Sequence, residues 1–303
     1  MKERLSVVIT CYREGHLLDE AVRSARAQSM AADEILVVND ASSDAATNEV
    51  CRRLQSEGQV RLVRRESNGG PSAARNTGFA AAQGDILVPL DADDLLPANA
   101  VADVHEAFAR YPDAGFIHGS YVRQDAPGRE RIVPARPLDL RTLLRPRRLS
   151  FSTDWTLIGT APLRRRLWTA VGECDASLGA DDLHDVDFWI RALALPCSQY
   201  AIPAVIYIWR KYLGHNSRRV TALAWQRIAG KHFEIYRQSG LEYRAHELLL
   251  VGSKCANAPA EAARHRAALL RSLGDGEIHA STLLALLPAP MIRWAARVAA
   301  GRR

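Results

Sequence analysis

Two acidic residues spaced two apart follow an apolar run and together suit a divalent cation. Asp91 and Asp93 come directly after the run Ile86–Leu90. If the extended conformation of a strand persists through them, both carboxylates project to the same side. Such a pair fits Mg²⁺ or Mn²⁺, hard ions that bind oxygen ligands and complete their shell with water and substrate phosphates. The alternative is a turn over residues 91–94 that caps a helix beginning near Pro97.

Further polar groups follow other apolar runs. Asp40 closes the run Glu34–Asn39, and Ser42, Ser43 and Asp44 follow it. This polar cluster can either accept a nucleobase N–H or cap the next helix. The segment 68–76 offers glycine N–H groups, a helix start and the guanidinium of Arg75, which suit an anionic ligand. His215 lies in a polar loop, where its imidazole either reaches a metal or a diphosphate or is simply solvated.

Four aspartates gather just before an apolar helical pattern. They are Asp181, Asp182, Asp185 and Asp187. Acidic side chains favour the first turn of a helix, and Asp187 has i,i+4 spacing to Arg191. Taken alone, helix stability therefore explains this cluster.

The elements that must position these groups alternate between strands and helices. The pattern predicts strands at Ser6–Thr10, Glu34–Asn39, Val60–Arg64, Ile86–Leu90 and Tyr200–Trp209. It predicts helices at Leu17–Gln28, Ala45–Ser56, Ser72–Gln83, Leu163–Val171 and Val186–Leu195, and after His215 at Val220–Gln238, Tyr243–Lys254, Ala260–Leu273 and from Ile278 onward. The Pro- and Arg-rich stretch Arg123–Arg148 is predicted to be a surface excursion. The fold class is therefore α/β, a doubly wound, mainly parallel sheet with helices on both faces and a C-terminal helical extension.

Composition limits the class of protein further. The 303 residues are 48% hydrophobic and 24% charged, which excludes disorder and a small disulfide scaffold. Five scattered cysteines without a CxxC pair indicate neither a disulfide framework nor a thiolate zinc site. The serine-hydrolase, phosphate-loop and zincin motifs are missing from the sequence. Since no signal peptide and no membrane-spanning run occur, a cytoplasmic location is expected.

Positive charge is concentrated in the C-terminal region. Residues 1–215 carry 26 basic and 28 acidic side chains, a net charge of −2, whereas residues 216–303 carry 14 and 6, a net charge of +8. One helical stripe there can hold Met291, Ile292, Ala295, Val298 and Ala299, with Arg293 and Arg297 on another. Such a helix either lies on the inner face of an anionic membrane or packs on the protein body or on a second subunit. Nothing suggests a nucleic-acid partner, and the sequence leaves the oligomeric state open.

Six segments in register resemble the signatures of family-2 glycosyltransferases with the GT-A fold. They are SVVITCYREG (6–15), ILVVNDASSD (35–44), NGGPSAARNTGFAAAQGD (68–85), LVPLDADDLLP (87–97), IGTAPLRRRLWTAVGECDASL (158–178) and HDVDFWIRAL (184–193). The resemblance extends over approximately residues 4–217. It implies a glycosyltransferase domain over 1–217, with a nucleotide-binding half 1–100 and an acceptor half 101–217, followed by a helical basic region over 218–303.

The resemblance also implies roles for individual residues. Donor binding would fall to Thr10, Tyr12, Glu14, Asp40, Arg75 and Asp91, metal binding to Asp93, Asp91 and His215, and general-base catalysis to Asp185, with Asp182 in reserve. The chain departs from the family pattern at Arg13, Asn39 and Cys174, where an Asn, an Asp and an aromatic residue are usual. These departures affect the expected base and sugar selectivity but leave the carboxylates in place.

The activity implied is inverting transfer of a sugar from a nucleotide-diphosphate donor, with UDP- or dTDP-sugars favoured, aided by Mn²⁺ or Mg²⁺. The acceptor would be a saccharide or lipid-linked hydroxyl in cell-surface polysaccharide or glycolipid synthesis. Two alternatives remain. One is a sugar-nucleotide-binding scaffold without turnover, and the other is a sugar nucleotidyltransferase, although the Gly-rich, Arg-containing first loop of that class is missing from Thr10–Gly15.

Overall fold

The computed structural model describes residues 3–145, 160–178, 183–213, 221–274 and 279–301. The chain divides into two compact units. The first contains the described residues of 1–137, 156–180 and 184–217, and the second those of 138–155, 181–183 and 218–303. The predicted division at 217/218 remains a prediction about domain organisation.

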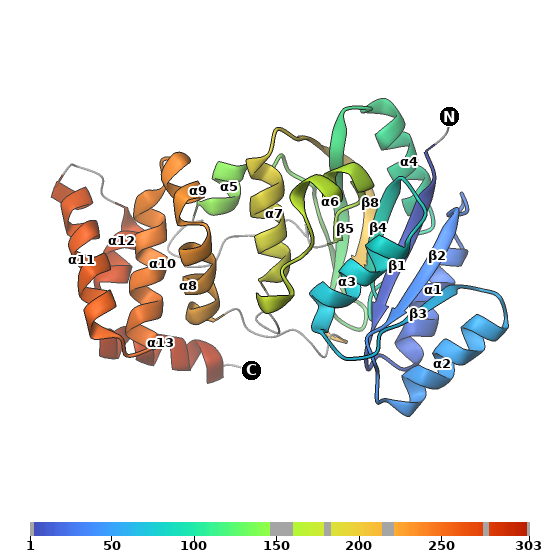
Figure 1. Ribbon diagram of the computed structural model, residues 1–303, viewed down its shortest axis with the longest axis horizontal. Coiled ribbons are helices and arrows are strands. Elements are labelled where there is room, and N and C mark those ends of the chain that lie inside the picture. Colours follow the sequence, from blue (N-terminus) through green and yellow to red (C-terminus); the bar gives the residue numbers. More distant parts are fainter. Residues whose placement is uncertain (1–2, 146–159, 179–182, 214–220, 275–278, 302–303) are drawn as a thin grey trace. The chain divides into compact units, whose positions relative to one another are not determined.

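Four parallel strands form one half of the sheet in the first unit (Figure 1). They are β1 (Leu5–Cys11), β2 (Glu34–Asn39), β3 (Arg61–Arg64) and β4 (Ile86–Asp91), in the order β3-β2-β1-β4. The connecting helices are α1 (His16–Arg26), α2 (Ala45–Ser56) and α3 (Gly70–Ala81), and α4 (Ala100–Arg110) follows β4. These elements lie within a few residues of the predicted ones, because buried strands and amphipathic helices have distinct hydrophobic periods.

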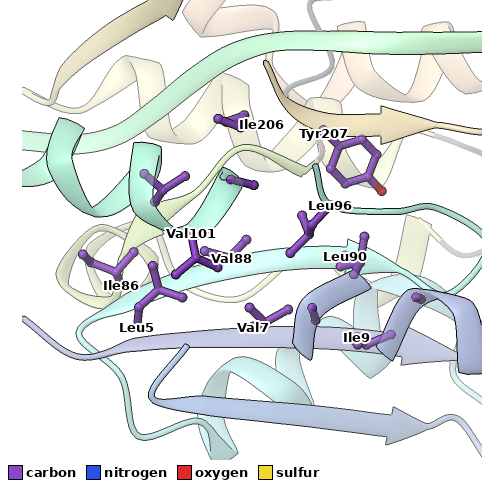
Figure 2. Packing of buried hydrophobic residues seen from close by; sticks show 14 of the residues in the cluster. Leu5, Val7, Ile9, Ile86, Val88, Leu90, Leu96, Val101, Ile206 and Tyr207 are labelled. Atoms are coloured by element: carbon purple, nitrogen blue, oxygen red, sulfur yellow. The ribbon is translucent and has the colours of Figure 1, made fainter. Parts of the chain in front are cut away.

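Helices cover both faces of this sheet, as predicted. The side chains of Leu5, Val7, Ile9, Ile86, Val88 and Leu90 pack in one cluster with α1, α2 and Val101 of α4 (Figure 2). On the other face, α3 approaches so closely that a Cβ at Gly78 would lie 2.4 Å from Val8 Cγ1. Only glycine allows this contact.

The second half of the sheet changes direction. β7 (Leu163–Arg164) is antiparallel to both β4 and β5 (Ala114–Ala126), and β5 also pairs with β6 (Arg129–Val133) and with the parallel strand β8 (Ser198–Trp209). Helices α6 (Arg165–Val171) and α7 (His184–Ala194) and the short helix η2 (Ala176–Leu178) complete this unit. The sheet is therefore mixed, with its parallel strands in the majority.

The predicted surface excursion Arg123–Arg148 contains regular elements. Gly128, at φ 69°, turns β5 into β6, α5 (Leu140–Leu144) follows, and residues 127–132 are exposed, as a surface position requires. The guanidinium of Arg123 is accommodated by Asp125 and by the ring of Trp209, 5.1 Å away, so arginines do not interrupt the strand. The predicted helix Leu163–Val171 begins only at Arg165, because its first two residues pair with neighbouring strands.

The second unit is helical. It contains α5, α8 (Ala222–Lys231), α9 (Phe233–Gln238), α10 (Glu242–Cys255), α11 (Pro259–Gly274), α12 (Ala280–Leu286) and α13 (Ala289–Gly301). Two predicted helices are each divided, one at His232 and the other before Pro288, which lacks the N–H that a continuous helix needs. In the described part of the chain, no helix combines the length and the apolar character needed to cross a membrane.

Candidate active site

The predicted donor-binding residues gather at one edge of the sheet. Register pairs Thr10 with Asp91 and Cys11 with Asn39, so β1, β2 and β4 end together. Asp40 follows directly after β2. Ligands of parallel sheets bind at this carboxyl edge, and the structure brings the predicted residues to it.

The acidic segment after β4 forms a turn. The strand ends at Asp91, whose carbonyl accepts a hydrogen bond from the backbone N–H of Asp94 at 3.0 Å. The prediction that an extended strand aligns Asp91 and Asp93 was therefore wrong, and a turn brings the two close instead. The alternative, a turn over residues 91–94 that caps a helix, is confirmed as to the turn but not as to the cap, because α4 begins only at Ala100, and the residue in its cap position is Asn99.

Two residues missed by the sequence analysis hold this turn. The carboxylate of Asp94 accepts hydrogen bonds from the hydroxyl of Tyr207 and the backbone N–H of Arg210, both at 2.7 Å. The guanidinium of Arg210 donates from Nε to the carbonyl of Asp93 at 2.6 Å and also bonds Glu20. Its buried Nη2 has no hydrogen-bond partner among the described residues. The sequence signal was the position of Arg210 directly after a predicted strand, which by itself does not identify the turn as its target.

Negative charge accumulates on this turn. Burial, with the nearby carboxylates of Asp91 and Glu14, raises the pKa of Asp93 to about 7. Burial, with the nearby carboxylates of Asp93 and Asp91, raises the pKa of Asp94 well above its ordinary value. Arg210 offsets only part of this repulsion at Asp93. A hydrogen bond from the backbone of Asp93 itself and the charge of Arg210 lower the pKa of Asp93 only in part, so a cation would relieve an unfavourable charge there.

The raised pKa of Asp93 makes the stability of the metal-free protein depend on pH. The folded state binds this proton more tightly than the unfolded chain, so stability should fall as the pH rises from 3.8 through about 7. We expect a loss of about 2 kcal/mol across this range, after allowance for partial exposure to water. Urea unfolding in EDTA should show a steeper slope in the wild type than in Asp93→Asn, which keeps only the contributions of Glu14 and Asp94. Equal slopes would contradict it.

Asp40 and Glu14 order the neighbouring loops. The carboxylate of Asp40 accepts hydrogen bonds from Arg65, Asn68 and the N–H groups of Gly69 and Gly70 at the start of α3. The same polar cluster caps the following helix, α2, as one alternative proposed, but through Asp44, whose carboxylate accepts the N–H of Thr47.

The Glu14 carboxylate accepts the backbone N–H groups of Tyr12 and Arg13, at 2.5 and 2.8 Å. Burial nevertheless raises its pKa. The guanidinium of Arg13 lies over the ring of Tyr12, 4.8 Å from the ring centroid. These contacts fix the backbone between β1 and α1, so that the Glu14 carboxylate lies close enough to the acidic turn to raise the pKa of Asp93.

Arg75 connects the acidic turn with the predicted base. Its buried guanidinium donates to Asp91 at 3.1 Å. Burial alone would lower the pKa of Arg75, but Asp91, Cys174 and Asp185 raise it. One pocket is lined by Arg75, Phe79, Pro89, Ala161, Leu163, Cys174, Asp185, Phe188 and Trp189. The structure therefore brings Asp91, Arg75 and Asp185 together.

Asp185 lies in the first turn of α7, and its carboxylate accepts the N–H of Val186 at 2.8 Å. Asp187, by contrast, is fully buried and paired with Arg191 at 2.8 Å, as the i,i+4 spacing indicated. His184 was missed by the sequence analysis. Burial lowers its pKa, and the charges of Asp185, Arg75 and Asp91 act on it. Of the four clustered aspartates, Asp181 and Asp182, like His215, lie outside the described residues.

A reciprocal amide contact anchors the segment beside the pocket. Asn76 of α3 donates to the carbonyl of Cys174 and accepts its N–H, both at 2.8 Å. Asn76→Ala should lower the free energy of unfolding by about 1–3 kcal/mol, because two buried backbone groups lose their partner. Thr77→Ala on the same helix removes one bond to Ala73 and should cost less than about 1 kcal/mol. Urea unfolding measures both, and equal losses would contradict the anchoring role.

Known proteins similar to this chain identify its family. The sequence profile described as Glycosyl transferase family 2 matches residues 6–170, more than half of the chain. Glycosyltransferase GlyG of Streptococcus pneumoniae is 30% identical over 126 residues, 41% of each chain. Succinoglycan biosynthesis protein ExoW of Rhizobium meliloti is 32% identical over 126 residues, 41% of this chain and 39% of that protein. The matches thus cover less than half the length of these two relatives.

Solved structures share the fold at low identity. TarS 1-349 of S. aureus in complex with UDP has a TM-score of 0.60 and 18% identity, over 82% of this chain and 70% of that one. The mannosyltransferase PcManGT of Pyrobaculum calidifontis, in complex with GDP-Man and Mn²⁺, has a TM-score of 0.55 and 20% identity, over 99% and 86%. The mixed sheet is thus of the GT-A type, and the chain belongs to glycosyl transferase family 2.

Proposed function

We propose that this chain is an inverting glycosyltransferase that moves a sugar from a nucleotide-diphosphate donor to an acceptor hydroxyl. The observation that carries the proposal is the connection made by Arg75, which bonds Asp91 of the acidic turn and lines one pocket with Asp185. This contact supports the proposal, because the acidic turn would hold an anionic leaving group and the Asp185 carboxylate would take the acceptor proton within the same unit. Both groups are required for direct displacement at a sugar carbon.

A divalent cation, Mn²⁺ or Mg²⁺, fits the acidic turn. Asp93 would bind it directly, and Asp91 directly or through water, because their mutual repulsion disappears when a cation lies between them. Among the described residues, no three acidic, His or Cys side chains form a complete metal site. This agrees with ions that take one or two carboxylates and complete their shell with phosphates and water. His215 as a further ligand remains part of the proposal.

The protein groups then divide the chemistry between the two sides of the sugar. A bound cation would supply Lewis-acid stabilisation of the diphosphate. Arg75 forms an ion pair with Asp91, which holds this carboxylate in place and adds positive charge next to it. Thr10, Tyr12, Glu14 and Asp40 would surround the nucleoside. Asp185 would take the proton of the acceptor hydroxyl as its oxygen attacks opposite the leaving group, so that one displacement inverts the anomeric carbon.

UDP- or dTDP-sugars are the favoured donors, since Asp40 can accept the N3 proton of uracil or thymine. In support, solved TarS structures contain UDP or UDP-GlcNAc. The acceptor would be a saccharide or lipid-linked hydroxyl in cell-surface polysaccharide or glycolipid synthesis. Relatives include a succinoglycan biosynthesis protein and the poly-beta-1,6-N-acetyl-D-glucosamine synthase of Staphylococcus aureus.

Calorimetry with UDP, dTDP, GDP and CDP, each with Mn²⁺ or with EDTA, tests the donor side. We expect one diphosphate to bind in a metal-dependent manner. Its sugars are then screened for release of nucleoside diphosphate, and the product is examined by NMR for inversion. Pyrophosphate release would instead indicate a nucleotidyltransferase. Donor binding without turnover across a broad acceptor panel would favour the scaffold alternative.

A further inference from the structure

The last helix of the second unit exposes an apolar stripe. On α13, Met291 is 51% and Trp294 67% exposed, whereas Ile292 is 6% exposed and packs inward. Ile292 therefore does not belong to the exposed stripe, contrary to the sequence prediction. Positions 291, 294, 295 and 298 have the spacing that puts them on one face of a helix. The outward face thus consists of a tryptophan and a methionine flanked by small apolar residues.

Positive charge surrounds this stripe. From His279 to the last residue the sequence contains no Asp or Glu, but it contains Arg293, Arg297, Arg302 and Arg303. Arg297 is exposed, one turn beyond Arg293, which bonds the carbonyl of Lys254 and the side chain of Asn257. A tryptophan beside arginines on an amphipathic helix is typical of segments in the headgroup region of a bilayer.

We propose that the face of α13 formed by Met291, Trp294 and Arg297 docks on an anionic lipid surface. The charge is complementary to such a surface, to which each basic side chain adds attraction. A second copy of the chain carries the same positive charge and would repel it. A stable protein interface also buries about 800 Å² on each partner, far more than two large side chains provide. Insertion of a few residues among lipid headgroups needs no such area.

The test is co-sedimentation of the full chain with vesicles of phosphatidylcholine alone or mixed with phosphatidylglycerol. We expect binding only to the mixed vesicles, with an affinity that falls as salt rises. The double variant Met291→Ser/Trp294→Ser should bind about tenfold or more weakly, and Arg297→Gln about threefold to tenfold more weakly. Because these side chains are exposed, thermal unfolding should remain close to wild type.

Matched controls are Ile132→Ser on β6 and Leu270→Ser on α11, whose side chains are 63% and 48% exposed. Both should bind vesicles as the wild type does. The proposal is overturned if the wild type does not bind mixed vesicles, if it binds neutral vesicles equally, or if the α13 double variant binds unchanged. A second copy of the chain is the other partner that this face could bind, and analytical ultracentrifugation without lipid tests it. A dimer that is lost in the double variant would assign this face to a second copy. None of these readouts depends on glycosyl transfer.

Discussion

Asp185→Asn is expected to lower the rate of sugar transfer by about 10²–10⁴-fold, the usual contribution of a positioned general base. The dissociation constant for the nucleoside diphosphate with Mn²⁺ should stay within about threefold of wild type, because the proposed role of Asp185 is toward the acceptor and not the donor. The carboxamide preserves the size of the side chain but cannot take the acceptor proton. Single-turnover rates and calorimetry on the same preparation measure the two effects separately.

Asp187→Asn is the matched control, since it makes the same chemical change two residues later on α7. Asp187 is fully buried and paired with Arg191, so this variant should lose about 1–3 kcal/mol of stability. Below its unfolding temperature it should keep a rate close to wild type. Full activity in Asp185→Asn would remove Asp185 as the base. Equal loss of rate in both variants would mean that the position of α7, rather than one carboxylate, controls the reaction.

Asp93→Asn should weaken Mn²⁺-dependent binding of the nucleoside diphosphate by about 10²-fold or more, because a direct oxygen ligand loses its charge. In the absence of metal the same variant should be more stable than the wild type at neutral pH. The reason is that the substitution removes a buried charge that Asp91 and Glu14 repel. Gain of stability together with loss of metal-dependent binding is the signature of a ligand rather than of a structural residue.

Asp94→Asn provides the contrast for this prediction. Its carboxylate accepts hydrogen bonds from Tyr207 and from the backbone of Arg210, so this variant should be destabilised by about 1–3 kcal/mol. Calorimetry and urea unfolding of both variants, in Mn²⁺ and in EDTA, compare them. Unchanged Mn²⁺-dependent binding in Asp93→Asn would exclude it as a metal ligand, and reduced stability in EDTA would assign it a structural role.

Elements with a strong local pattern were predictable from the sequence. β2 and α2 have the predicted bounds. The hydrophobic pattern of each element and the cap at Asp44 are local signals, which can be read from a few neighbouring residues. β6 and β7 were missed. The first contains charged residues on an edge hairpin and the second has only two residues, so their pairing depends on partners distant in the sequence.

The sequence by itself determined the alternating α/β order, the acidic residues after β4 and, through six segments in register, the resemblance to a glycosyltransferase family. Tertiary structure alone decided that Asp91–Asp94 is a turn held by Tyr207 and Arg210, and that Arg75 bonds Asp91 beside Asp185. These contacts join residues 16 to 116 positions apart, and no local periodicity encodes such partners. Secondary structure follows from neighbours along the chain, whereas the charges and hydrogen bonds of a site depend on what folding brings together.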